Sequence, residues 1–323
     1  MKNIENIYLC QKAKCFAVEN GRHIKLNKKI FDVGTTSIKV FFDDFFKSNE
    51  LLAEIKDKTY TKDLTIKNNK KRYRANLFHD NRKGWCLSLR ELPKSIANWE
   101  DLNIKVNDII SISKSTGLTL FCGPTGAGKS TTMCRTILEL QQINKLGITI
   151  TVEDPVEYLF NKDNIFQREV NTDVMSFDKG VYEAMRQCPD TIVIGEIRDK
   201  KTALAALKAA FTGHKVLSTL HANSVQDAIL RLWAFFDDQD DEILIYALQG
   251  IVAQHLIRTD KAYCVYESLC IDDNVKNALL TALRESNNLR MLNNEFYSQQ
   301  RKTLQNKKDE LIKEGVEPSL LQF

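Results

Sequence analysis

Residues 117–132 read GLTLFCGPTGAGKSTT, and the rest of the chain is best understood from this stretch. An apolar run, Leu118–Cys122, has the character of a β-strand and leads into a glycine-rich loop that opens a helix. The loop matches GxxxxGK[ST], in which backbone N–H groups and a helix N-terminus surround a phosphate. Gly126 and Gly128 can take positive φ and let the phosphate approach the backbone. The stretch therefore predicts a P-loop between a strand and a helix.

The loop also predicts its ligands, ATP and Mg²⁺. Lys129 is expected to reach the β- and γ-phosphates, and the Ser130 hydroxyl is expected to complete a Mg²⁺ shell. A glycine-rich turn without a ligand is the alternative, but the strand before and the helix after are the context that the motif requires. The predicted phosphate-binding residues are Gly123, Pro124, Thr125, Gly126, Ala127, Gly128, Lys129, Ser130 and Thr131.

Size and charge limit the classes of protein to consider. The 323 residues are enough for two domains, and the net charge of +4 is too small to indicate a nucleic-acid binder by itself. Membrane surfaces remain possible partners. No apolar run approaches the roughly 18 residues of a spanning helix, and residues 1–8 lack the apolar core of a signal peptide. We therefore expect a cytoplasmic protein.

The eight cysteines are scattered, and no Cys-x-x-Cys pair occurs among them. Cys10 and Cys15 are the nearest approach to a ligand pair, but no second pair completes four-coordination. The pattern favours reduced, mostly buried thiols over a zinc site or a disulfide framework.

Residues 1–94 are predicted to form a small mixed α+β domain. Short strands are expected over Lys14–Val18 and His23–Leu26, around a turn that contains Asn-Gly. Aromatic residues at helical spacing predict a helix over Ser37–Ile55. Residues 72–92 alternate in polarity and predict a β-hairpin with its turn near residues 80–84.

A linker is predicted over residues 95–105, after Pro93, and a second domain over 106–323. Apolar strand-like runs alternate there with helical stretches, which predicts a parallel sheet covered by helices on both faces. The expected strands are Leu118–Cys122, Ile148–Val152, Thr191–Ile194 and Lys215–Leu220, and the expected helices begin near Lys129, Lys179, Lys201 and Ser224.

The tail from Asn274 onwards has a helical pattern. Residues 299–313 are highly charged with few apolar positions, which indicates a solvated helix. A regulatory or docking element is the alternative interpretation of the same segment.

Two carboxylates, Glu153 and Asp154, follow the second predicted core strand. Because the carboxyl ends of parallel strands meet at one ligand crevice, both side chains should face the phosphates near Lys129. Glu153 suits a base that orients water, and Asp154 suits a group near the nucleotide or metal. A surface turn before Pro155 is the alternative.

Glu196 ends the third core strand, Thr191-Ile-Val-Ile-Gly-Glu196. An apolar strand that ends in a carboxylate matches the Walker B pattern, in which the carboxylate holds Mg²⁺ or polarises the metal-bound water. The signal is weak alone and becomes stronger downstream of a P-loop.

Residues 212–223 place one histidine at each end of the fourth core strand, His214 before it and His221 after it. A lone histidine is more often structural than catalytic. At the carboxyl end of a strand, however, His221 could hydrogen-bond the γ-phosphate and respond to its loss. We also assign His214 to the nucleotide site.

Taken together and in this order, the four clusters resemble the secretion and pilus ATPase superfamily, the hexameric motors of type II secretion and type IV pili. The P-loop, the "Asp box" at 151–157, the Walker B segment at 184–199 and the "His box" at 212–223 each match the family pattern. The resemblance continues through Gln254-His-Leu256, and the short first domain is most like the pilus retraction branch.

This resemblance implies a PAS-like first domain joined to a RecA-like ATPase domain, six copies in a ring, and nucleotide between the two domains. It also implies that some of Arg74, Arg82 and Arg90 in the first-domain hairpin reach the phosphates when the domains close. The implied partner is a platform protein of the inner membrane, with peripheral association of the motor through that partner. Direct binding of nucleic acid is not expected.

The resulting hypothesis is an ATP-hydrolysing motor for pilus assembly, retraction or secretion. Competence and type IVB secretion or conjugation ATPases share the same four boxes and remain alternatives. A P-loop phosphotransferase would need an acceptor lid, and a RecA-like nucleic-acid translocase would need an aromatic and basic platform for single strands. Neither feature is evident in the sequence. A nucleotide-sensing scaffold without turnover is a further alternative.

Overall fold

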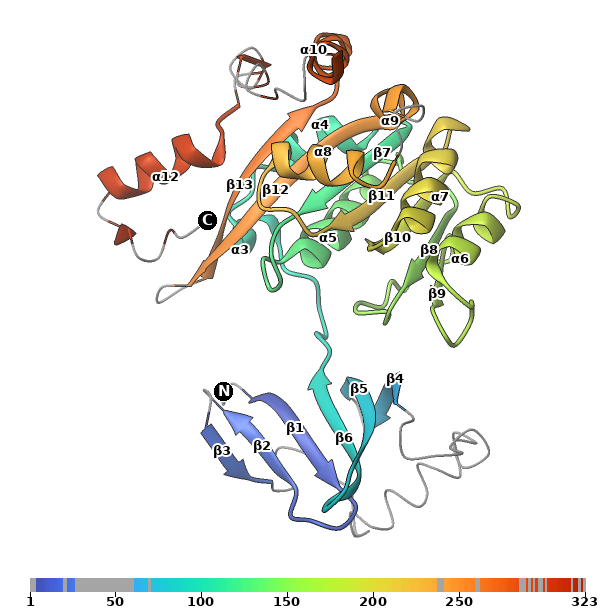
Figure 1. Cartoon of the computed structure of the whole chain (residues 1–323), viewed down its shortest axis with the longest axis vertical. Coiled ribbons are helices and arrows are strands. Elements are labelled where there is room, and N and C mark those ends of the chain that lie inside the picture. Colours follow the sequence, from blue (N-terminus) through green and yellow to red (C-terminus); the bar gives the residue numbers. More distant parts are fainter. Residues whose placement is uncertain are drawn as a thin grey trace. The chain divides into compact units, whose positions relative to one another are not determined.

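The computed structural model describes residues 4–19, 22–26, 61–68, 71–236, 241–258, 262–284 and 301–314, together with single positions between and after the last two ranges. The chain divides into two compact units, Met1–Ser95 and Ile96–Phe323. Each unit is described by itself below, and both are drawn in Figure 1. The predicted helix over Ser37–Ile55 lies outside the described residues.

The first unit is built on an antiparallel sheet, of which six strands fall within the described residues. The predicted hairpin is present as β5 and β6, joined by a turn at residues 81–83. Alternating side chains of β1, β5 and β6 form the core of the unit, where Leu9, Tyr73 and Leu87 are almost completely buried. In spatial order the strands are β3 (Arg22–Lys25), β2 (Phe16–Glu19), β1 (Ile4–Cys10), β6 (Gly84–Glu91), β5 (Lys71–Asp80) and β4 (Lys62–Asn68).

The segment predicted as a linker, residues 95–105, belongs almost entirely to the second unit. It contains the short helix α3 (Trp99–Leu102), whose Trp99 and Leu102 are buried together with Ile104 in the core of that unit. Trp99 and Leu102 are buried because the apolar side chains of α3 face inward, while the polar side chains of Glu100 and Asp101 occupy its first turn.

The second unit is organised around a larger sheet, with seven strands in the described part of the chain. All neighbouring strands of this sheet pair in parallel except β12 and β13, which pair with each other antiparallel. The predicted α/β fold with a mainly parallel sheet is therefore confirmed. In spatial order the strands are β13 (Ala262–Cys270), β12 (Leu248–Arg258), β7 (Gly117–Cys122), β11 (Lys215–Leu220), β10 (Thr191–Ile197), β8 (Thr149–Glu153) and β9 (Ile165–Glu169).

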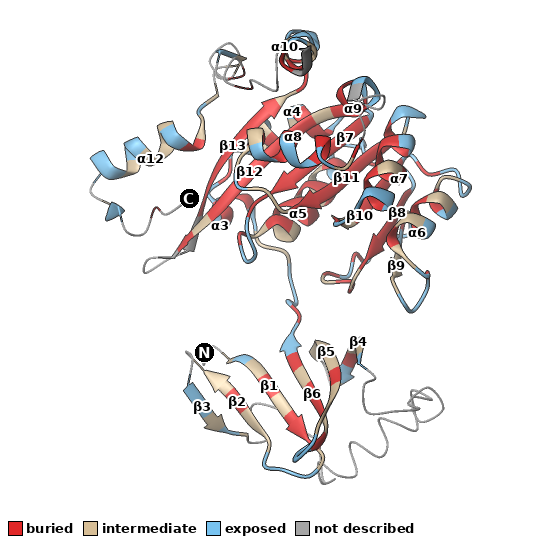
Figure 2. Ribbon diagram, viewed as in Figure 1, coloured by how far each residue is buried: buried red, intermediate tan, exposed pale blue. Residues whose placement is uncertain are grey.

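Helices cover both faces of this sheet, so the central strands are buried on both sides (Figure 2). Phe121, Val193 and Leu217 point to one face, whereas Leu120, Ile194 and Val216 point to the other. The first face packs against α3, α4 (Val106–Ser113) and α5 (Lys129–Gln142). The second packs against α6 (Phe177–Ala184), α7 (Lys200–Phe211), α8 (Val225–Trp233), α9 (Asp241–Ala247) and α10 (Asp273–Arg284).

The strands β9, β12 and β13 and the packing of α12 were not predicted. Strands β12 and β13 form an antiparallel hairpin at one end of the sheet, beside β7. The charged tail contains α12 (Leu304–Lys313), whose Leu304 is buried in the main core although half of the helix residues are exposed. Among the described residues, no helix combines the length and apolar character needed to cross a membrane.

Helix α6 packs closely on the sheet through Gly180. A Cβ atom at this position would lie 2.8 Å and 3.0 Å from the two γ-carbons of Val152 in β8. Val152 is fully buried and β-branched, so its side chain has little freedom to move away. The absence of a side chain at residue 180 therefore sets the distance between α6 and β8.

We predict that Gly180→Ala destabilises the protein, although alanine favours a helix by about 1 kcal/mol over glycine. Overpacking of a rigid core costs about 1–3 kcal/mol, so the net loss should lower the melting temperature by a few degrees. Thermal unfolding followed by circular dichroism measures the effect. The control is Lys179→Ala on the exposed side of the same helix, which should leave the melting temperature nearly unchanged. A higher melting temperature for Gly180→Ala would contradict this packing.

Candidate active site

The P-loop lies between β7 and α5 and adopts the backbone conformation that glycine permits. Gly123, Gly126 and Gly128 have φ values of 154°, 80° and 85°. A Cβ atom on Gly123 would lie 2.3 Å from the carbonyl oxygen of Gln254 in β12, so the loop rests directly on that strand. Gly128 caps the N-terminus of α5, whose unpaired N–H groups and dipole favour an anion.

Lys129 is buried beneath this loop rather than extended into solvent. Its Nζ donates hydrogen bonds to the carbonyl oxygens of Gly123, at 2.8 Å, and Pro124, at 3.0 Å. Burial lowers the pKa of Lys129, and the nearby carboxylate of Glu196 acts in the opposite direction. The ammonium group is therefore held at the mouth of the loop by carbonyls that an incoming phosphate can replace.

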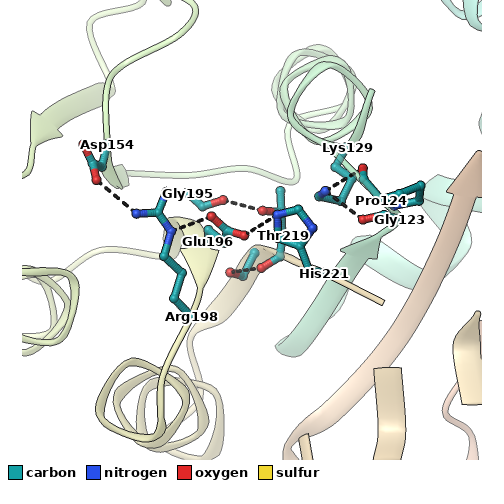
Figure 3. Close-up of polar contacts among 10 residues, drawn as sticks. Gly123, Pro124, Lys129, Asp154, Gly195, Glu196, Arg198, Thr219 and His221 are labelled. Carbon is teal, nitrogen blue, oxygen red and sulfur yellow. Dashed lines mark hydrogen bonds and ion pairs between the residues drawn. The ribbon is translucent and has the colours of Figure 1, made fainter. Parts of the chain in front are cut away.

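The carboxyl ends of β8, β10 and β11 meet beside the loop and carry a chain of charged side chains (Figure 3). Arg198 bridges two carboxylates, with Nη1 3.2 Å from Asp154 Oδ2 and Nε 2.6 Å from Glu196 Oε2. The other oxygen of Glu196, Oε1, lies 2.9 Å from His221 Nε2. One connected network thus joins the Asp box, the Walker B segment and the His box.

The position of Glu196 depends on a break in the strand register. Strand β10 pairs regularly with β11 up to Ile194, and the register shifts before Ile197. Within this irregularity, the Gly195 carbonyl accepts a hydrogen bond from Thr219 Oγ1 at 2.6 Å. Such irregularities re-aim side chains, and this one turns Glu196 toward His221.

The surroundings of the His221 imidazole disfavour its charged form on balance. Burial and the charge of Lys129 lower the pKa of His221, against the opposing effect of Glu196. The ring lies against the Glu196 carboxylate, with Nε2 2.9 Å from Oε1, so the two side chains are held side by side.

Glu153 occupies a separate and drier position at the end of β8. It is 6% exposed, and its Oε1 accepts hydrogen bonds from Thr151 Oγ1, at 2.7 Å, and Gln167 Nε2, at 3.0 Å. Burial raises the pKa of Glu153 to about 7, although these hydrogen bonds act in the opposite direction. A carboxyl group with such a pKa can accept or release a proton near neutrality.

The structure brings most of the predicted site residues to one edge of the sheet, with an exception at His214. This residue precedes β11, at the opposite end of the strand from His221, and its Nδ1 lies 3.0 Å from the Ala209 carbonyl at the end of α7. The assignment of His214 to the nucleotide site is therefore corrected, because six strand residues separate it from the carboxyl edge.

The remaining predicted site residues lie in the first turn of α5 and in the β5–β6 hairpin of the first unit. Thr131 lies in the first turn of α5, where its hydroxyl is 2.9 Å from the Tyr158 hydroxyl. Ser130 is in the same turn and half-buried. Arg74 and Arg90 face each other across the hairpin of the first unit, and Arg82 lies in its turn; their role at the phosphates stays a prediction.

Two residues of this site were not assigned from the sequence. Arg198 stands two positions after Glu196, a spacing that places both side chains at the end of one strand, but an arginine there is also typical of an exposed turn. Gln254 is 1% exposed, and its Nε2 donates to the Ala127 carbonyl of the loop at 2.6 Å. Only the resemblance of the Gln254-His-Leu segment to a family motif pointed to this strand.

A model of the type II/IV secretion system protein family matches residues 64–314, which is most of the chain. The chain belongs to this family. Its match covers the P-loop, the bridged carboxylates and His221. Family membership therefore confirms the predicted resemblance to the secretion and pilus ATPases.

Individual relatives come from both pilus and secretion systems. The chain is 35% identical over 198 residues to the type IV pilus retractation ATPase PilT of Pseudomonas aeruginosa, covering 58% of this chain and 56% of that protein. It is 40% identical over 178 residues to the type II secretion system protein E of Aeromonas hydrophila, covering 54% and 32%. The chain therefore spans about half or less of the length of these relatives.

Among solved structures, the pilus retraction motor PilT with bound ADP matches with a TM-score of 0.81 and 29% identity, over 99% of this chain and 91% of that one. The ATPase DotB of Legionella pneumophila matches with a TM-score of 0.74 over 99% and 91%. At 23% identity, this match shows only that the two proteins share a fold.

We predict that Glu153→Gln stabilises the protein at alkaline pH and not at acidic pH. Below its ordinary pKa of 4.5 Glu153 is protonated in both states. Between 4.5 and about 7 only the unfolded chain loses the proton, so the free energy of unfolding falls as pH rises. The loss, about 3 kcal/mol at most, is complete above that range. Glutamine cannot ionise and keeps an acceptor for Thr151 and Gln167.

Denaturant unfolding without nucleotide, at about pH 5 and about pH 8, measures this difference. Glu183→Gln is the control, because Glu183 is half-exposed and paired with Arg168 at 2.7 Å. The control should show the same small change at both pH values. A Glu153→Gln variant that is less stable than the wild type at the higher pH would show that the fold favours the ionised carboxylate.

Proposed function

We propose that the chain is an ATP-hydrolysing motor subunit that powers a type IV pilus or a type II-like secretion machine. The observation that carries the proposal is the network at the P-loop, in which Glu196 and His221 lie beside Lys129 at the carboxyl edge of the sheet. A P-loop alone binds phosphate. A carboxylate and an imidazole directed to the same place provide groups for hydrolysis and for sensing its outcome.

The residues present fit a nucleotide with Mg²⁺. The Gly123 backbone lies against β12 where a Cβ would collide, and Gly126 and Gly128 turn the loop around a space at the N-terminus of α5. Ser130 and Glu196 supply oxygen ligands of the kind that Mg²⁺ prefers. Bound there, the ion would neutralise charge on the phosphates as they react.

The protein groups then divide the remaining tasks. Lys129 balances charge on the phosphates, in place of the loop carbonyls that it contacts now. Glu153 accepts the proton of the attacking water, which its raised pKa allows near neutral pH. His221 Nε2, which lies 2.9 Å from Glu196 Oε1 in this arrangement, forms a hydrogen bond to the γ-phosphate in a loaded site.

Assembly and coupling complete the proposal. Six copies form a ring, and one or more of Arg74, Arg82 and Arg90 complete the site when the first unit closes on the nucleotide. The ring acts at the cytoplasmic side of the inner membrane on a platform protein that adds or removes pilin-like subunits. The matches to PilT and to type II secretion protein E support the shared motor activity of both branches.

We predict that Lys129→Ala lowers ATP turnover about 100-fold or more, because the charge that forms on the phosphates loses its cation. Phosphate release by the purified chain measures turnover. Lys208→Ala, on the exposed side of α7, is the control and should turn over normally. Thermal unfolding of both variants shows that each is folded. Undiminished turnover in Lys129→Ala would remove the basis for the proposed function.

We also predict that Arg198→Ala lowers kcat roughly 10- to 100-fold, the usual effect of losing a group that orients a ligand of the metal. Arg198→Lys should recover only part of the loss, because one ammonium cannot hold Asp154 and Glu196 in the same two-sided geometry. The control, Arg168→Ala, breaks an ion pair with Glu183 and leaves both site carboxylates in place. Equal rates for Arg198→Ala and the control would show that the bridge plays no part in turnover.

A further inference from the structure

Glu267 of β13 is a buried carboxylate shared between two helices. It is 4% exposed, although glutamate is rarely buried without strong partners. Its Oε1 accepts a hydrogen bond from the backbone N–H of Val225, and its Oε2 accepts one from the N–H of Leu304, both at 2.7 Å. These N–H groups belong to the first residues of α8 and α12, so one carboxylate satisfies the N-termini of both helices.

The α8 side of this contact is directly connected to the active site. Strand β11 ends at Leu220 and α8 begins at Val225, so only residues 221–224 lie between them. His221 is the first of these four residues. A turn this short has little freedom, and the point at which α8 begins therefore fixes the position of His221 relative to Glu196.

A second side chain on the same face of the hairpin supports the same turn. His255 Nε2 donates a hydrogen bond to the Asn223 carbonyl at 2.8 Å. Ala253 pairs with Glu267 across the hairpin, and His255 follows two positions later, so His255 and Glu267 share a face. The β12–β13 hairpin thus holds the His221 turn at both Asn223 and Val225.

The α12 side of the contact spans the edge of the sheet. Leu304 is buried in the same core cluster as the inner face of α8. Three residues later, Lys307 Nζ lies 3.6 Å from the centroid of the Tyr266 ring, which faces the other side of β13. Helix α12 therefore packs around β13 and contacts both faces of that strand. Glu267 contacts the first residue of the helix.

We propose that Glu267 is a positioning residue for His221, and that it holds the His221 turn fully only while α12 is docked on its second carboxylate oxygen. If α12 leaves, a buried carboxylate oxygen loses its donor, which is costly and weakens the hold on α8. Nucleotide binding at His221 and docking of α12 then favour each other. This inference rests on the proposed function, because it requires ATP to bind beside His221.

Thermodynamic linkage allows the coupling between nucleotide binding and α12 docking to be measured without ATP turnover. If docked α12 improves the binding of nucleotide, nucleotide must protect docked α12 by the same factor. We expect a non-hydrolysable ATP analogue with Mg²⁺ to slow hydrogen exchange of the α12 amides in the full chain about fivefold or more. The affinity for a fluorescent ATP analogue is measured on the same preparation.

Leu304→Pro removes the α12 donor while keeping a helix-compatible backbone. Proline is well tolerated at the first position of a helix, and Thr303 already has φ −69° and ψ 161°, which suits a residue before proline. Leu304→Ala is the matched control, since it truncates the same side chain and keeps the N–H. We expect the analogue to protect α12 in the alanine variant and not in the proline variant, with affinity for the analogue about fivefold or more weaker in the latter.

Glu267→Gln tests the carboxylate itself, because an amide offers one acceptor oxygen where two N–H groups need acceptors. In the Glu267→Gln variant, as in Leu304→Pro, the ATP analogue should no longer slow hydrogen exchange of the α12 amides. Binding of the analogue without any change in α12 exchange in the wild type would overturn the coupling and leave the proposed function intact. Equal behaviour of the proline and alanine variants would overturn the role of the N–H contact. If the wild type binds no nucleotide, the proposed function and this inference fail together.

Discussion

The active site depends on the convergence of parallel strands at one edge of a sheet. The register of β8 and β10 aligns Val152 with Ile194, so the next residues, Glu153 and Gly195, are neighbours as both strands end. A Cβ on Gly195 would lie 3.2 Å from the Glu153 backbone, and glycine allows this close approach. The charged residues that follow are therefore brought beside the P-loop by strand pairing and not by long flexible loops.

Strand pairing also explains which parts of this structure could be predicted from the sequence. The strands β7, β8, β10 and β11 are short apolar runs bounded by polar residues, a pattern visible within a few positions. Once their parallel order is assumed, Lys129, Glu196 and His221 must lie at one edge, and the structure places them there. The same reasoning should have excluded His214, which precedes its strand and therefore lies at the opposite edge.

The parts that escaped prediction depend on contacts between distant segments. The apolar runs of the β12–β13 hairpin are short and interrupted by polar residues such as Gln254 and Glu267, so they fit a helix or a strand equally well. Nothing local indicates that Gln254 supports the P-loop across 127 positions, or that Glu267 meets the N-terminus of α12. The charge pattern of residues 299–313 did predict a helix with exposed charged residues, but it did not show that Leu304 is buried in the core or that Lys307 packs on Tyr266.

The two glutamates of the site show how environment can separate the roles of identical side chains. Glu196 is surrounded by a guanidinium and an imidazole, and both of its oxygens are engaged by them. Glu153 is instead buried among neutral donors, where its pKa is raised to about 7. A carboxylate held by a cation is suited to bind a metal, whereas one with a raised pKa is suited to take a proton. Burial and the charge of the neighbouring side chains thus distinguish the two carboxyl groups, and both agree with the roles that the motifs predict for them.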